Sequence, residues 1–152
     1  RGRLGPGRVH HCMRLIGLAE MALELACQRG QERTAFGKPL ANLGGNRERI
    51  AKARIAIEST RLLVLHAAWK LDTEGSFGAI SEVSQIKVAA PTMAQEVIDF
   101  AMQLHGGGGM SDDYPLAGAW TTARALRLAD GPDEVHLGLI ARLELGKYKS
   151  SR

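Results

Sequence analysis

The chain has 152 residues, of which 45% are hydrophobic and only 5% aromatic. A chain of this length buries roughly 70% of the surface that it exposes when unfolded, so one domain with a real core is expected and a disordered tail is excluded. The net charge is +4, but acidic and basic residues alternate, as in Arg47-Glu48-Arg49. Because no basic block with interleaved aromatic residues occurs, we expect no nucleic-acid partner.

The sequence contains no targeting or membrane signal. No run of eighteen apolar residues occurs, so we expect no membrane span. The N-terminal segment, RGRLGPGRVHH, lacks the apolar stretch of a signal peptide, and we expect the chain to begin inside a longer protein. Cys12 and Cys27 fall on one expected helix, too far apart to bridge, which favours a reducing, intracellular setting.

Five helices are expected in chain order, over about residues 10–29, 47–73, 81–105, 116–129 and 133–147. The first has apolar residues over most of its surface, which predicts a central, buried helix with Gly30 as its C-cap. The segment that follows it, to Gly45, shows no strand-length alternation.

The second and third helices have the clearest periodicity. The second repeats apolar residues every seven positions, with small residues three positions behind: Ile50, Ile57, Val64 and Leu71, then Ala53, Thr60 and Ala67. The third carries one apolar stripe: Ile86, Ala90, Met93, Val97, Ala101 and Leu104. Pro91 predicts a kink in the third helix, and the four glycines 106–109 predict its end. The expected fold is all-α, an up-and-down four-helix-bundle-like domain with an additional C-terminal helix.

Two segments between the expected helices allow either a structural or a binding interpretation. Arg33-Thr34-Ala35-Phe36-Gly37 is either a connection anchored by a buried Phe or an arginine directed at a phosphate beside an aromatic ring. Gln103-Leu104-His105 with the glycine run is either a helix stop or a cradle whose backbone N–H groups approach an anion.

The segment 127–136 places three carboxylates within a few residues. Asp133 and Glu134 are accounted for by the start of a helix, where acidic residues are favoured. Asp130 precedes a glycine at the end of an apolar run, where a partly desolvated carboxylate can act as a base. We expect no metal site, because His10, His11 and Cys12 point in different directions on a helix.

These segments, in this order, resemble the C-terminal domain of the acyl-CoA dehydrogenases. The resemblance covers essentially the whole chain, so residues 1–152 are expected to form one such domain. It rests on these segments: Gly5-Pro6-Gly7-Arg8, GLAEMAL at 17–23, RTAFGKPL at 33–40, QLHGGGG at 103–109, Asp113-Tyr114-Pro115 and ADGPDEV at 129–135. It is closest to the branch whose catalytic segment reads LADGPDEVH.

The resemblance implies FAD-dependent dehydrogenation of an acyl-CoA thioester to a trans-2-enoyl-CoA. Asp130 matches the family's catalytic base, and Arg8 matches the active-site arginine near the base and substrate. Arg33, Phe36 and Leu40 match residues that contact FAD. Gln103, Gly106 and Gly107 match the segment that reaches the adenosine-diphosphate part of an FAD held mainly by a neighbouring subunit.

The resemblance also implies partners. We expect a homodimer or homotetramer that passes electrons to an electron-transferring flavoprotein, with fatty-acid β-oxidation as its setting. The location would be the cytoplasm of a bacterium, or otherwise an intracellular organelle of fatty-acid oxidation. The N-terminal helical and central β-domains of the family are absent from this chain, so we expect the isolated chain to be inactive or nearly so.

Several positions depart from the family pattern. Asp130 is one methylene shorter than the usual Glu, and Ala129 replaces an aromatic residue often found before the base. Pro132 stands where many members have a Thr that bonds the flavin, and Gly44 where a Gln often contacts the cofactor. The departures at Pro132 and Gly44 favour an alternative, a non-catalytic helical oligomerisation module. A flavin oxidase or monooxygenase on the same bundle would need no carboxylate at position 130, so the presence of Asp130 argues against that alternative.

Overall fold

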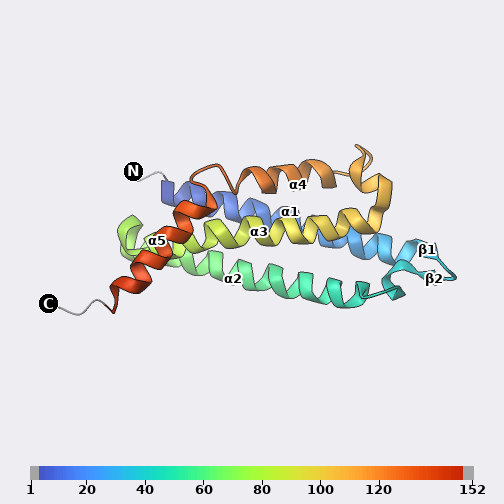
Figure 1. The fold of residues 1–152 in the computed structure, drawn as a ribbon, viewed down its shortest axis with the longest axis horizontal. Coiled ribbons are helices and arrows are strands. Elements are labelled where there is room, and N and C mark those ends of the chain that lie inside the picture. Colours follow the sequence, from blue (N-terminus) through green and yellow to red (C-terminus); the bar gives the residue numbers. More distant parts are fainter. Residues whose placement is uncertain (1–3, 149–152) are drawn as a thin grey trace.

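The computed structural model describes residues 4–148, which form a bundle of five α-helices. The helices are α1 (Leu4–Glu32), α2 (Asn46–Gly78), α3 (Ile80–His105), α4 (Leu116–Ala125) and α5 (Asp133–Gly146). Helices α1 to α4 run alternately up and down side by side, and α5 crosses the bundle near the N-terminal end of α1 (Figure 1). The predicted all-α class, with an additional C-terminal helix, is confirmed.

The core lies around α3, which packs against α1, α2, α4 and α5. All six residues of its predicted stripe are buried. The expected central helix, α1, is buried on one side only: Met13 is exposed, whereas Leu15 and Ile16 are buried. The prediction of a central α1 was therefore wrong. Helix α3 is the central helix because its buried side chains pack against α1, α2, α4 and α5. It continues through Pro91 to His105.

Helix α1 begins earlier and ends later than predicted. Gly5-Pro6-Gly7-Arg8, which precedes the predicted start of the helix, lies within its first turns, because a proline in the first turn of a helix costs no helical hydrogen bond. Gly30 lies inside the helix and is not its C-cap. A Cβ there would come within 3.3 Å of the Ala41 Cβ, so Gly30 permits close approach of the following segment.

Helix α2 presents the predicted face to the core. Its buried residues are Ala53, Ile57, Thr60, Val64 and Ala67, and regular helix geometry breaks at Gly75, where φ is 71°. The opposite face exposes the large apolar side chains of Ile55, Leu62, Leu65 and Trp69.

Short elements connect the helices at the end of the bundle far from α5. Strands β1 (Thr34–Ala35) and β2 (Lys38–Pro39) form a small antiparallel hairpin, followed by the 3-10 helix η1 (Leu40–Asn42). The second 3-10 helix, η2 (Gly106–Met110), follows α3 directly. As predicted, the glycine run ends α3: Gly106 takes a φ of 59°, which glycine adopts at little cost.

Candidate functional site

The candidate base lies in the connection between α4 and α5. Asp130 has a φ of 57°, a left-handed conformation that few residues other than glycine adopt. Aspartate is among those that tolerate it best. The next residue, Gly131, has a φ of 101°, and a Cβ there would lie 2.9 Å from His136 Nε2. Glycine is therefore required beside the base, both for its conformation and for space.

Two side chains from other elements hold the main-chain carbonyl of Asp130. Arg8 of α1 donates from Nε at 3.2 Å, and His136 of α5 lies with Nε2 at 3.2 Å. The predicted proximity of Arg8 and Asp130 is thus present, but the contact is to the peptide oxygen. These contacts stabilise a backbone conformation that would otherwise cost roughly 1–3 kcal/mol.

The Asp130 carboxylate points toward α1. Its Oδ2 lies 3.1 Å from His11 Nε2, and both side chains are about one-third exposed. His11 Nδ1 is buried and has no hydrogen-bond partner among the described residues. Because a carboxylate oxygen only accepts, the proton of this contact lies on His11 Nε2. His11 then donates to Oδ2 and leaves Oδ1 for chemistry.

His136 joins the base segment to α3. Its Nδ1 lies 3.3 Å from Ser84 Oγ, while Nε2 faces the Asp130 carbonyl. Because a carbonyl only accepts, Nε2 carries the proton and Nδ1 accepts from the serine hydroxyl. Burial lowers the pKa of His136, opposed by its hydrogen bond to the Asp130 backbone. The neutral ring is the form that the fold holds.

A second group of side chains holds the same connection. Lys87 of α3 is fully buried, and its Nζ donates to the main-chain oxygens of Leu126 and Gly131. Arg127 pairs through Nε with Asp133 Oδ2 at 2.7 Å. Asp133 therefore forms an ion pair at the start of α5 and makes no N-capping hydrogen bond.

Most of the residues matched to FAD contacts gather at the other end of the bundle. Arg33, Leu40, Gln103 and Gly106 line one groove of about 670 Å³, together with Arg29 and Arg49. Arg29 Nε is buried without a partner among the described residues. A groove with three arginines and an unpaired buried N–H suits an anion with several oxygens, such as a diphosphate. These residues fit the adenosine-diphosphate end of FAD.

The two remaining matched residues lie outside that groove. Phe36 forms the hairpin turn with a φ of 50° and is 95% exposed, so the buried-anchor interpretation is wrong. Its ring is available to a surface outside this chain. Gly107 is exposed beside Gly106, and no heavy atom lies within 4 Å of the position that a Cβ would take.

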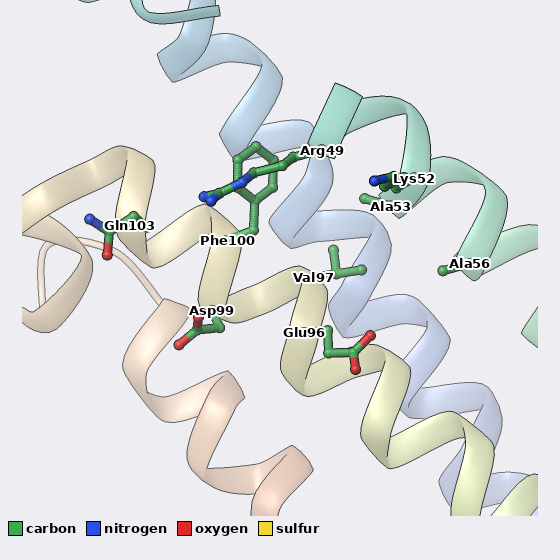
Figure 2. A pocket seen from close by; sticks show the side chains of 9 residues that line it. All are labelled: Arg49, Lys52, Ala53, Ala56, Glu96, Val97, Asp99, Phe100 and Gln103. Atoms are coloured by element: carbon green, nitrogen blue, oxygen red, sulfur yellow. The ribbon is translucent and has the colours of Figure 1, made fainter. Parts of the chain in front are cut away.

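A neighbouring groove of about 660 Å³ runs between α2 and α3 and shares Arg49 and Gln103 with the arginine-lined groove. Figure 2 shows the Arg49 guanidinium against the Phe100 ring, with the Gln103 amide beyond it. The Arg49 Cζ lies 6.0 Å from the ring centroid, a distance that permits a cation–π contact. Arg49 is thus held where both grooves meet.

The base and the arginine-lined groove lie at opposite ends of the bundle. Helix α1 carries Arg8 and His11 near its start and Arg29 near its end, and the 21 residues from Arg8 to Arg29 span about 32 Å. The base and the groove of one chain are therefore well separated along the bundle.

Sequence reasoning missed His11, Lys87 and His136. Of these three residues, only Lys87 could have been noticed in the sequence, because it is a charged residue within the apolar stretch from Ile86 to Ala90 of α3. Within residues 4–148, no group of histidine, cysteine or acidic side chains is arranged to hold a metal, and no helix is both long and apolar enough to cross a membrane.

The fold is an α-helical bundle with a candidate base at one end and an arginine-lined groove at the other, and comparison with known proteins gives the family. The acyl-CoA dehydrogenase C-terminal domain model matches residues 1–145. The chain belongs to the acyl-CoA dehydrogenase family, as the resemblance predicted.

Individual relatives agree with this assignment. Acyl-CoA dehydrogenase family member 11 of Rattus norvegicus is 56% identical over 95% of this chain, which covers 19% of that protein. A structure of a candidate acyl-CoA dehydrogenase from Mycobacterium abscessus is 77% identical, with a TM-score of 0.96 over 97% of this chain and 36% of that one. Butyryl-CoA dehydrogenase from Megasphaera elsdenii is 31% identical, with a TM-score of 0.85 over 93% of this chain and 37% of that one. The chain thus spans well under half of these relatives.

Proposed function

We propose that this chain supplies the general base and part of the flavin site for FAD-dependent α,β-dehydrogenation of an acyl-CoA thioester. The observation that carries the proposal is the Asp130 carboxylate, which is partly exposed on a segment held by side chains of α1, α3 and α5. A fixed carboxylate with one unoccupied oxygen is the group that removal of an α-proton requires.

In the proposed reaction, Asp130 Oδ1 takes the α-proton of the thioester while the β-hydrogen leaves with its electron pair. Bound FAD would supply the acceptor for that hydride, and the product would be a trans-2-enoyl-CoA. His11 holds Oδ2 and fixes the carboxylate rotamer, and Arg8 and His136 fix the backbone that carries it. Asp130 is regenerated when it releases the proton.

The arrangement of the two ends favours a shared cofactor site. The arginine-lined groove of one subunit would hold the adenosine-diphosphate end of an FAD whose flavin lies against Asp130 of another subunit. This requires at least a homodimer, and a homotetramer built from dimers is also consistent with it. Phe36 would contact the cofactor or the other subunit from the exposed hairpin.

The rest of the site and the onward partner belong to the same proposal. Because the chain spans 19% to 37% of its relatives, N-terminal helical and central β-domains would supply the remaining flavin and acyl walls. Electrons would pass to an electron-transferring flavoprotein in fatty-acid β-oxidation. Two free cysteines are consistent with an intracellular location, the cytoplasm in a bacterium or an organelle of fatty-acid oxidation elsewhere.

A second candidate function, a non-catalytic oligomerisation module, is favoured by the outer face of α2. Ile55, Leu62, Leu65 and Trp69 follow one another at helical spacing and are 51% to 66% exposed. A stripe of this kind suits helix–helix association without chemistry.

The visible spectrum of the complete polypeptide, recorded anaerobically before and after addition of a panel of acyl-CoAs, separates the two functions. The proposed dehydrogenase shows a flavin band that bleaches with acyl-CoAs of a preferred chain length. A protein without flavin, or one whose flavin band ignores every acyl-CoA, would instead support the oligomerisation module.

A further inference from the structure

Lys87 has an unusual environment for a lysine. Its side chain is completely inaccessible and is the largest fully buried side chain of the described residues. Burying an ammonium group is costly, and lysine is almost never fully buried unless its charge is compensated. No carboxylate of the described residues lies within 4 Å of Nζ, so Lys87 is not part of a direct ion pair.

Main-chain carbonyls compensate the ammonium instead. Nζ donates to the oxygens of Leu126 and Gly131, which bracket the segment that carries Asp130. The nearby thiol of Cys12 does not neutralise the charge, because it donates to the Ile86 carbonyl and burial raises its pKa to about 12. The base segment is thus tied at both ends to one side chain of the central helix.

The two hydrogen bonds of Lys87 hold a strained part of the chain. Asp130 and Gly131 both have positive φ, and such conformations persist only where several contacts enforce them. Arg8 and His136 hold the Asp130 carbonyl itself, whereas Lys87 holds the carbonyls on either side of it. Loss of Lys87 would release both ends while leaving the base and its direct contacts in place.

We propose that Lys87 is a positioning residue for the base, holding the segment from Leu126 to Gly131 so that the Asp130 carboxylate meets the α-carbon of the substrate. This rests on the proposed dehydrogenase function. A displacement of about 1 Å in a reacting group costs about a hundredfold in rate. Loosening this segment should therefore reduce the rate of proton removal more than substrate binding.

The test uses the complete polypeptide with Lys87→Met, which keeps the shape of the side chain but removes the donor. We expect the rate of flavin reduction by acyl-CoA to fall about 10- to 100-fold, with flavin content and acyl-CoA Kd within about twofold of wild type. The isotope effect on reduction by an α-deuterated acyl-CoA should rise, because proton removal becomes slower. Lys87→Arg, which restores a cationic donor, should recover part of the rate.

Ile98→Val provides the control for general core damage. Ile98 is fully buried on the same helix, eleven residues or about 16 Å along it from Lys87. The Ile98→Val substitution should lower thermal stability without changing the isotope effect. Hydrogen exchange at residues 126–131 gives an independent readout and should be faster in Lys87→Met than in Ile98→Val.

Three results would overturn the inference. One is a wild-type reduction rate in Lys87→Met measured well below its Tm, and another is unchanged hydrogen exchange at residues 126–131. The third is a loss of rate that merely follows loss of flavin or stability, as in Ile98→Val. If wild-type enzyme itself ignores every acyl-CoA, the proposed function fails first, which is a distinct outcome.

Discussion

At the scale of single residues, the properties of Asp130 come from its backbone as much as from its carboxylate. The residue sits in a left-handed conformation, which aspartate and asparagine tolerate better than glutamate does. Its neighbour, Gly131, accommodates His136 against the peptide. The shorter base is therefore compatible with the turn that presents it, and the turn depends on glycine at the next position.

Gly131→Ala should destabilise the protein by roughly 1–3 kcal/mol, because alanine is strained at a φ of 101° and its Cβ would clash with His136. Thermal unfolding of the complete polypeptide measures the change. Gly138→Ala is the matched control on α5. No heavy atom lies within 4 Å of its added Cβ, and a glycine-to-alanine change inside a helix stabilises by up to about 1 kcal/mol. Equal effects of the two substitutions would contradict the account of the turn.

His11→Leu should lower the rate of flavin reduction about tenfold, because the carboxylate loses the hydrogen bond that fixes its rotamer. His11→Gln can still donate and should retain more activity. The adjacent His10 is exposed and has no contact with Asp130 among those described, so His10→Gln should leave the rate unchanged. Rapid-mixing spectroscopy measures all three. A His11→Leu enzyme as fast as wild type would remove His11 from the site.

At the scale of elements, the buried faces of α2 and α3 follow directly from their apolar periodicity, because burial requires one continuous stripe. The start of α1 was not predicted, since Gly5-Pro6-Gly7 also has the composition of a turn. Lys87 was missed because lysine is expected at the surface, and its carbonyl acceptors lie in a distant part of the chain. The position of Asp130 before a glycine suggested a base and the family resemblance supported that role, whereas its contacts with Arg8, His11 and His136 required the fold.

The packing of α5 against α3 should depend on pH through His136. Burial lowers the pKa of this imidazole below its usual 6.5, with Arg8 and Lys87 acting in the same direction and Asp133 opposing them. Below pH 6.5 the unfolded chain binds a proton at His136 that the folded chain resists, so protonation favours unfolding. The free energy of unfolding therefore keeps its full value above pH 6.5 and decreases as the pH falls below it. The Tm of the complete polypeptide should therefore drop between pH 7 and pH 5. His136→Gln should flatten that dependence, and an identical slope in the variant would contradict the assignment.

At the scale of the whole molecule, the bundle separates two kinds of site along its length. The base precedes α5, which Figure 1 shows crossing the start of α1, and the arginine-lined groove includes Arg33 and Leu40, which flank the hairpin of β1 and β2. Along helix α1, the 21 residues from Arg8 to Arg29 span about 32 Å between them. In the proposed function, a cofactor that uses both ends is shared between subunits.

Mixed oligomers test this sharing. Asp130→Asn removes the base, and Arg33→Glu places a negative charge in the groove where a diphosphate would lie. Each homo-oligomer should be nearly inactive. Purified heterodimers of the two variants should regain up to about half of the wild-type turnover, because one composite site then has both an intact base and an intact groove. No recovery in the heterodimer would mean that each subunit binds FAD by itself.

The most direct test of the central claim, that Asp130 is the base, is the anaerobic rate of flavin reduction by acyl-CoA in the complete Asp130→Asn polypeptide. Asparagine tolerates the same left-handed backbone and retains the main-chain carbonyl held by Arg8 and His136, so flavin content and thermal stability should remain close to wild type. We predict a fall of at least about a hundredfold in the reduction rate, because no carboxylate remains to take the α-proton. Reduction at the wild-type rate would contradict the account.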